Sequence, residues 1–316
     1  MESMSPSIEF LKRFFLFKAF SPDTQNPNIP LLERVGNKKV ALLSVGSCGL
    51  KSATLTKGKD GPVISDIDSI TMRLQDDVTD HPFLAALPKK TDCGLVVLCL
   101  GWKFMLNTEQ NKLKNNTELN MELQVNAQSV MGSKFQANKR YMGLLSEDRK
   151  YSMISDIEED LIQSVEDTLS NYNLKVIRAQ IGLMSMMNVM FSDPEVISSS
   201  LANIPLLHDN GHVVVMVRQE NRMNLRLFTS MIDTKPDNQV VERSSKLIER
   251  LGEILKSSRP GKDTVFWVAD TGLPNIEKVM DNFCATIKHD AKVSWKPYTV
   301  EGVPPNALEF KGITLN

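Results

Sequence analysis

The sequence predicts an α/β protein made of two related halves, each with a mixed sheet. Three observations support this fold class. Each half opens with candidate strands joined by short turns, which is typical of antiparallel strands. Each half then alternates strands with helices, which indicates parallel strands joined by crossover connections. The 316 residues, 41% hydrophobic and 24% charged, suffice for roughly two globular domains.

The first half begins with a predicted meander, in which short glycine-containing turns at 46–49 and 58–61 separate three strands. A fully apolar run then predicts a buried core strand, and a polar excursion at 107–120 follows it. The remaining segments are two helices with 3.6-residue periodicity, a strand and a methionine-rich helix whose methionines we assign to the core. In chain order, these elements are expected at 40–45, 50–56, 62–72, 93–100, 118–130, 156–169, 174–181 and 182–191.

The second half repeats this pattern, with a hairpin followed by alternating helices and strands. His208 and His212 have the spacing of two metal ligands on a helix, but the turn-forming residues between them indicate an exposed loop. We therefore expect no metal site there. The halves are predicted to divide at 210/211, with the first (38–210) carrying an inserted helical subdomain and the second covering 211–316. The elements of the second half are expected at 211–217, 223–229, 239–256, 264–269, 274–288 and 291–295.

An aromatic segment precedes both halves, because five of the 13 phenylalanines lie within residues 1–20. We predict an amphipathic helix there, followed by a linker rich in Pro and Asn at 21–37. Three interpretations stay open: the helix packs on its own body, lies in a bilayer interface, or inserts into a groove of a partner or a second copy. The candidate contact residues are Phe10, Phe14, Phe15, Phe17, Phe20, Lys12, Arg13 and Lys18.

Composition excludes several classes of protein. Lys and Arg number 37 against 38 Asp and Glu, so the chain lacks the basic excess typical of nucleic-acid binding. The four cysteines form no CxxC pair, which indicates a reducing compartment and no metal role. No apolar stretch approaches the roughly 18 residues of a membrane span. We therefore expect a cytoplasmic protein that can touch the inner face of the cytoplasmic membrane.

Residues 40–55 resemble the first phosphate loop of the actin/Hsp70/sugar-kinase superfamily, followed by its lysine and second strand. Residues 150–177 resemble a strand, helix and return strand of that superfamily, and residues 266–276 resemble its adenosine-side strand, turn and helix. Within the superfamily the chain is similar to the PilM and GspL-cytoplasmic-domain proteins of type IV pilus assembly and type II secretion. The resemblance covers about residues 38–296. It implies an actin-like fold of duplicated RNase H-like subdomains, preceded by the N-terminal helix and linker.

The resemblance also implies a nucleotide cleft, but its chemistry is degenerate. The superfamily's first strand normally ends in an aspartate that organises Mg²⁺, and Ser44 stands in that place. The second phosphate loop, expected at 217–222, has neither aspartate nor glycine. We therefore expect no catalytic residues, no metal and no cofactor, with ATP disfavoured. The residues of this vestigial cleft are Gly46, Ser47, Gly49, Lys51 and Gly272.

The expected function is that of a non-catalytic, actin-like scaffold. It would couple a membrane-embedded type IV pilus or type II secretion-like assembly to cytoplasmic components, by binding an inner-membrane protein or its cytoplasmic peptide. The alternative is an ATP-dependent small-molecule kinase or ATPase of the same superfamily.

Overall fold

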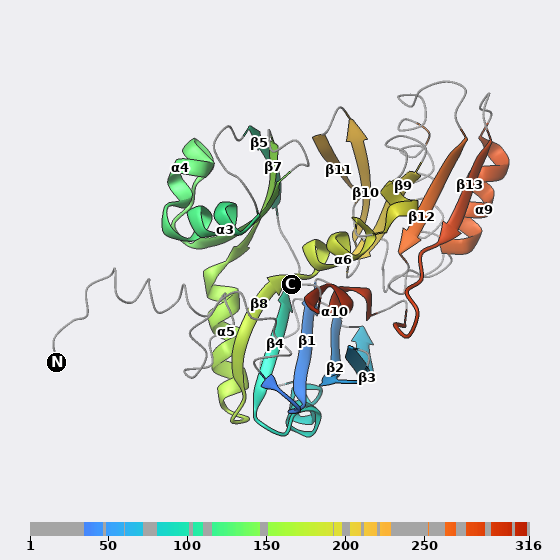
Figure 1. The fold of residues 1–316 in the computed structure, drawn as a ribbon. Coiled ribbons are helices and arrows are strands. Elements are labelled where there is room, and N and C mark those ends of the chain that lie inside the picture. Colours follow the sequence, from blue (N-terminus) through green and yellow to red (C-terminus); the bar gives the residue numbers. More distant parts are fainter. Residues whose placement is uncertain are drawn as a thin grey trace. The chain divides into compact units, whose positions relative to one another are not determined.

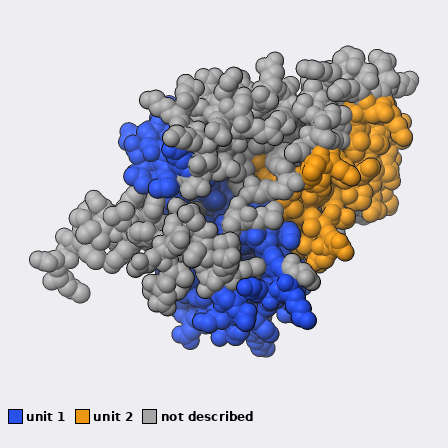
Figure 2. All heavy atoms as spheres, viewed as in Figure 1, with its two compact units in different colours: residues 1–185, 309–316 blue, residues 186–308 orange. Residues whose placement is uncertain are grey.

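The computed structural model divides the chain into two compact units, residues 1–185 with 309–316 and residues 186–308 (Figure 2). The predicted N-terminal helix at 1–20, nearly all of the linker at 21–37 and nearly all of the helix at 239–256 lie outside the described residues. The described residues are 35–46, 49–59, 61–71, 81–100, 104–109, 116–145, 151–191, 193–197, 203–209, 212–219, 222–228, 252, 263–269, 276–287, 292–304 and 307–314.

Unit 1 is built on a five-stranded mixed sheet with the order β3-β2-β1-β4-β8 (Figure 1). The meander strands pair antiparallel, whereas β4 and β8 run parallel to β1. This arrangement follows from the connections, since a two-residue turn joins β1 to β2 and only long connections reach β4 and β8. The strands are β1 (Val40–Gly46), β2 (Gly49–Lys57), β3 (Pro62–Thr71), β4 (Leu95–Leu100) and β8 (Lys175–Ile181).

The helices of unit 1 include η1 (Leu84–Lys90) and α5 (Glu159–Ser170). In α5, Ile162, Val165 and Leu169 are buried at helical spacing, as the sequence periodicity predicts. The helix begins at Glu159 rather than at the predicted residue 156, because 151–158 forms a strand.

A second, three-stranded sheet with the order β5-β7-β6 is inserted between β4 and β8. Its strands are β5 (Phe104–Glu109), β6 (Lys139–Leu145) and β7 (Tyr151–Glu158), and α3 (Asn116–Val125), α4 (Ala127–Met131) and η2 (Gly132–Lys134) accompany them. The insertion is therefore mixed rather than helical, and part of the predicted polar excursion is a strand. Its core consists of Leu119, Leu123, Met131, Tyr141 and Ile154.

Unit 2 has its own five-stranded sheet with the order β11-β10-β9-β12-β13. Phe266 of β12 and Phe283 of α9 are fully buried and meet edge to face at 5.4 Å between ring centroids. The strands are β9 (Asn203–Asp209), β10 (His212–Gln219), β11 (Arg222–Phe228), β12 (Thr264–Ala269) and β13 (Val293–Pro297). The helices are α6 (Gly182–Phe191), which begins in unit 1, α7 (Pro194–Ile197) and α9 (Ile276–Thr286).

The strand β9 was not predicted, and it changes how the second half is organised. The sequence places residues 203–209 in the first half, yet β9 pairs with β10 and β12 inside the second sheet. His208 consequently lies in β9 and His212 opens β10, so the prediction that both are loop residues is wrong. Met186, Met187 and Met190 of α6 are buried, as predicted.

Both sheets therefore follow one plan: an antiparallel meander of three strands, whose first strand is extended by two parallel strands. The chain ends in α10 (Leu308–Ile313), and residues 309–316 belong to unit 1. Among the described residues, no helix is long and apolar enough to cross a membrane.

Candidate functional site

The predicted phosphate-loop residues lie around the β1–β2 turn of unit 1. Gly46 and Gly49 form the last cross-strand pair before this turn. Lys51 follows two residues into β2, where it pairs with Ser44 of β1. Ser47 lies in the turn and Gly272 lies between β12 and α9, both outside the described residues.

Lys51 and Ser44 belong to a continuous row of residues that crosses the whole sheet. Residues in register on adjacent strands project from the same face of a sheet, so the members of this row are neighbours on one face. The edge residue of the row is exposed, while the other four are at most 8% exposed. We call it the polar row, and it consists of Ser69, Lys51, Ser44, Cys99 and Gln180.

The helix α10 supplies the charge that Lys51 requires. Lys51 Nζ donates to Glu309 Oε1 at 2.7 Å, and Glu309 is only 2% exposed. Phe310 and Ile313 of the same helix are fully buried. Figure 1 shows α10 at the ends of β1 and β2. The apolar residues thus anchor α10 while Glu309 neutralises the lysine.

The opposite end of the polar row is closed by the first turn of α6. Gln180 Nε2 donates to Ser185 Oγ at 2.9 Å, and that hydroxyl in turn donates to the carbonyl of Ile181 at 3.3 Å. Gly312 of α10 packs directly on this turn, because a Cβ atom added to Gly312 would lie 2.0 Å from the Ser185 carbonyl oxygen. Only glycine permits this contact, so α10 covers the row at close range.

The buried charge of Lys51 is balanced from within the chain. Lys51 carries the positive charge, the neutral Ser44 adds none, and the carboxylate of Glu309 provides the counter-charge. The side-chain amide of Gln180 donates its hydrogen bond to Ser185. Glu309 Oε2 is buried and accepts no hydrogen bond within the described part of the chain. Lys51 and Gln180 of the polar row therefore each bond to a residue outside the row, Glu309 and Ser185.

The turn at 217–222 is not the topological equivalent of the β1–β2 turn. In the duplicated topology β9 takes the place of β1, so the turn equivalent to 46–49 connects β9 to β10. Its closing pair is Asp209 with His212, and the intervening sequence is Asn210-Gly211. An aspartate and a glycine are therefore present there. The absence of aspartate and glycine noted at 217–222 concerns the next hairpin, between β10 and β11.

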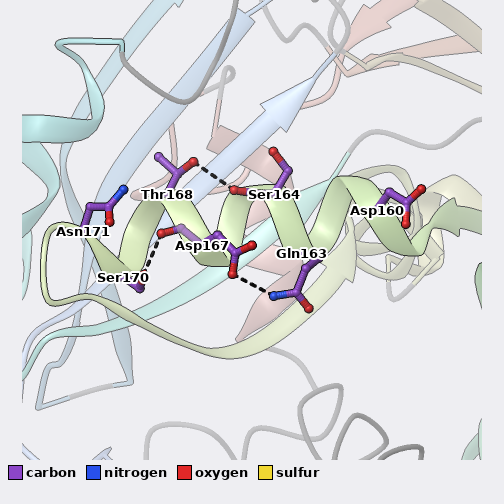
Figure 3. Close-up of a pocket in the computed structure, with 7 residues that line it drawn as sticks. All are labelled: Asp160, Gln163, Ser164, Asp167, Thr168, Ser170 and Asn171. Carbon is purple, nitrogen blue, oxygen red and sulfur yellow. Dashed lines mark hydrogen bonds between the residues drawn. The ribbon is translucent and has the colours of Figure 1, made fainter.

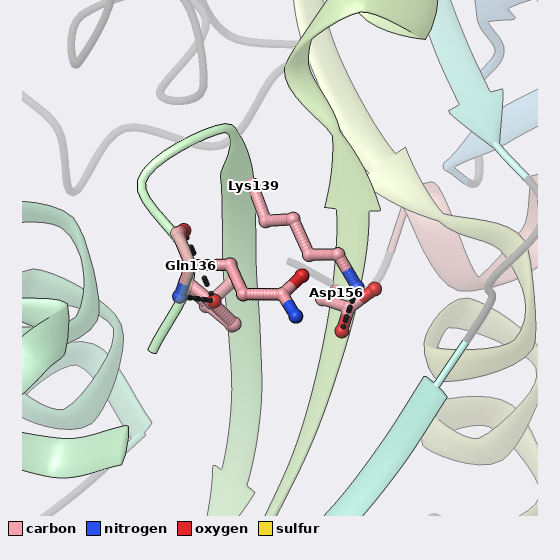
Figure 4. A network of polar contacts seen from close by, with 4 residues as sticks. Gln136, Lys139 and Asp156 are labelled. Atoms are coloured by element: carbon pink, nitrogen blue, oxygen red, sulfur yellow. Dashed lines mark hydrogen bonds and ion pairs between the residues drawn. The ribbon is translucent and has the colours of Figure 1, made fainter. Parts of the chain in front are cut away.

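A second buried charge lies in the inserted sheet (Figure 4). Lys139 Nζ donates to Asp156 Oδ2 at 3.1 Å, and Asp156 is 4% exposed. The Tyr141 hydroxyl accepts from the backbone N–H of Gln136 at 2.8 Å. Burial, chiefly, raises the pKa of Tyr141 above its usual value. Asp156 is thus a buried residue of the strand β7, whereas Glu159 and Asp160 lie in the first turn of α5.

The outer face of α5 carries a polar hollow (Figure 3). Its side chains bond along their own helix: Gln163 Nε2 donates to Asp167 Oδ1 at 2.8 Å, and Thr168 Oγ1 donates to the Ser164 carbonyl at 2.9 Å. These contacts stabilise the helix surface, and they bring together no set of groups for catalysis. No group of three or more metal-ligating side chains occurs among the described residues.

No protein-family model and no curated protein matches the chain. Several solved structures, in contrast, are similar to the chain. PilM of the PilM–PilN type IV pilus biogenesis complex superposes with a TM-score of 0.59 at 13% identity, over 87% of this chain and 97% of the other. A Bacteroides thetaiotaomicron protein with an actin-like ATPase fold and unknown function gives 0.54 at 10% identity, over 92% and 100%. The chain has an actin-like fold.

This result confirms the predicted fold class and the structural resemblance. The cytoplasmic domain of EpsL, an inner-membrane component of the Vibrio cholerae type II secretion system, is also similar, with a TM-score of 0.47 at 10% identity over 87% of this chain and 93% of the other. The fold assignment does not depend on that third likeness. Identities this low establish the fold and not the activity of the actin-like chain.

Glu309 and Gln180 are among the residues of the site that the sequence did not indicate. Glu309 stands in the run Ala307-Leu-Glu-Phe310, and a lone charge among apolar residues is a signal of a buried ion pair. Gln180 is the penultimate residue of the predicted strand that precedes the methionine-rich helix. Neither residue could be joined to Lys51 without the tertiary structure.

Proposed function

We propose that this actin-like chain is a non-catalytic cytoplasmic scaffold. It couples a membrane-embedded pilus or secretion-like assembly to cytoplasmic components by binding an inner-membrane protein or its cytoplasmic peptide. The observation that carries the proposal is the polar row, because Lys51 is neutralised by Glu309 and Gln180 is held by Ser185. A row whose lysine and glutamine are already bonded to Glu309 and Ser185 is poorly suited to holding a polyphosphate, which favours binding of a protein as the activity.

The partner class comes from the PilM–PilN complex, a type IV pilus biogenesis assembly of the same fold. We test it by co-expressing the tagged chain with each inner-membrane assembly protein encoded beside it, and measuring co-purification from detergent extracts. A stoichiometric complex with one of them supports the scaffold. If none of them is retained and the neighbouring genes are metabolic, the scaffold proposal fails.

The phenylalanine-rich segment is the proposed membrane or partner contact of this scaffold. Its cations and phenylalanines suit the interface of an anionic bilayer. Flotation with vesicles containing phosphatidylglycerol should recover the full chain and lose a chain lacking residues 1–20. Equal flotation of the two removes the membrane contact and leaves the partner groove or packing on the body.

The second candidate function is an ATPase or small-molecule kinase, and one observation favours it. Asp209 precedes the turn that corresponds to the first phosphate loop and Gly211 is part of it, and a carboxylate beside backbone donors suits a metal–polyphosphate. Phosphate release from Mg-ATP by the wild-type chain, abolished by Asp209→Asn, would establish this function in place of the scaffold.

A further inference from the structure

We propose that α10 is an internal ligand of the polar row. In this proposal the Glu309 carboxylate occupies the anion site at Lys51, and phosphate-bearing molecules enter only when α10 is displaced. The inference rests on the proposed function, because it explains how an actin-like fold is kept from holding nucleotide while it serves as a scaffold. The ligand class that α10 excludes is a polyphosphate anion.

The first support is electrostatic. Lys51 is 8% exposed, and a buried ammonium group requires an anion within hydrogen-bond distance. Ser44, its cross-strand partner, is neutral. Within the described part of the chain, Glu309 is the carboxylate that pairs with Lys51. The row is therefore built around a cation, and the anion that satisfies it comes from a separate segment.

The second support is the origin of that anion. Lys51 and Glu309 are 258 residues apart in the chain, so their contact exists only while α10 is docked. A helix of six residues has no stability of its own, since nucleating a single helical turn is unfavourable. The helix α10 is held by Phe310, Ile313 and Glu309, and its release would uncover the row without unfolding the sheet.

The third support is that Glu309 is an incomplete occupant. Its Oε2 atom is buried and accepts no hydrogen bond from the described residues. A buried acceptor without a donor costs free energy. This cost destabilises the docked state of Glu309 and so favours its replacement at Lys51 by an anion whose oxygens all find donors. Gly312 adds a steric limit, because any side chain there would strike the Ser185 carbonyl and lift α10.

The experiment measures binding of sodium triphosphate by titration calorimetry to the full chain and its variants. Glu309→Gln removes the competing charge but keeps the size of the side chain and an acceptor for Lys51. Gly312→Ala displaces α10 without touching the charges. The matched controls are Glu301→Gln, an exposed carboxylate, and Gly252→Ala, where an added Cβ would meet Ile287 at an ordinary 3.5 Å. Lys51→Met combined with Glu309→Gln removes the proposed anion site.

We expect Glu309→Gln and Gly312→Ala to bind triphosphate at least about tenfold more tightly than the wild type, because each removes a competing buried contact. The two controls should match the wild type, and Lys51→Met should abolish the gain. A folded Glu309→Gln that gains nothing, or a gain that survives Lys51→Met, overturns the proposal.

If a variant does not fold, hydrogen exchange of the wild-type chain tests whether triphosphate displaces α10. A large excess of triphosphate should accelerate amide hydrogen exchange in residues 308–313 and leave α5 unchanged. Unchanged exchange in α10 overturns the proposal. Failure of the scaffold is distinguishable, because it appears as absent co-purification with an assembly partner while triphosphate binding by Glu309→Gln persists.

Discussion

The two five-stranded sheets share one strand order, but their equivalent rows carry opposite chemistry. Both β1–β2 and β9–β10 are joined by two-residue turns, so positions can be matched by counting from each turn. Lys51, Ser44 and Cys99 of the first sheet correspond to Val214, Leu207 and Ala269 of the second. The first row is polar and needs a counter-charge, whereas the second is apolar.

This difference shows that a duplicated topology does not duplicate a site. Strand order and register are set by turns, crossovers and apolar packing, and both units satisfy these requirements. A buried charge is not required by strand order or register, and it costs desolvation free energy. Unit 1 has Lys51 where unit 2 has Val214. The carboxylate that balances it arrives from the last helix of the chain. Perturbing each unit should therefore reveal electrostatic control in the first and packing control in the second.

The largest effect is expected from breaking the buried pair in unit 1. Lys51→Met leaves Glu309 buried and unpaired, and should lower the free energy of unfolding by about 3–5 kcal/mol in urea titrations. Lys51→Met with Glu309→Leu removes both charges and should lose much less. If the single and double variants are equally destabilised, the pair does not hold α10.

A smaller loss is expected from Gly312→Ala. The added Cβ would approach the Ser185 carbonyl to 2.0 Å, so the helix must shift, at about 1–3 kcal/mol of unfolding free energy. Gly252→Ala, which meets only an ordinary contact, is the control and should be close to neutral. Thermal unfolding of both variants checks this, and an unaffected Gly312→Ala would show that α10 does not pack closely on α6.

Unit 2 should respond to packing. Phe283→Leu removes the edge-to-face contact with Phe266, and should cost about 1 kcal/mol beyond the apolar area lost. Trp267 and Trp295 both lie in unit 2, so the tryptophan fluorescence of a Trp102→Phe background reports on its unfolding. The loss should be the same at low and high salt, whereas a strongly salt-dependent loss would contradict packing control.

The smallest effect concerns alkaline pH in unit 2. Burial, followed by the negative charge of Asp193, raises the pKa of Tyr298 to about 12. The phenol of the unfolded chain ionises near pH 10, so this contribution to stability is complete below pH 10 and declines between pH 10 and 12. Tyr298→Phe should flatten the fall in stability over that window. An identical pH profile for both proteins would show that Tyr298 does not contribute.

Much of the fold could be predicted because it depends on local patterns. Apolar runs and glycine turns located β1, β2, β3 and β4, and helical periodicity located α5. The strand β9 was missed because Pro205 and a lack of alternation hide it, although parallel pairing on β12 and antiparallel pairing on β10 stabilise it. Because β9 was missed, the second phosphate loop was sought in the β10–β11 hairpin rather than in the turn equivalent to 46–49.

The candidate site could be predicted only in part. The glycine turn and Lys51 were recognised from their order in the chain, and the structure places them at one end of β1 and β2. Glu309 was not recognised, because no local pattern connects residues 258 positions apart. Gln180 enters the row only through the parallel pairing of β4 with β8. The charge balance of a site is a tertiary property, and sequence order does not contain it.

We propose that this actin-like chain binds a protein partner and does not use ATP, and titration calorimetry of Mg-ATP into the full wild-type chain is the decisive measurement. We expect no binding at micromolar concentrations, because Glu309 already pairs with Lys51. Micromolar binding by the wild type, reduced by Asp209→Asn and by Lys51→Met, would instead establish a working nucleotide site.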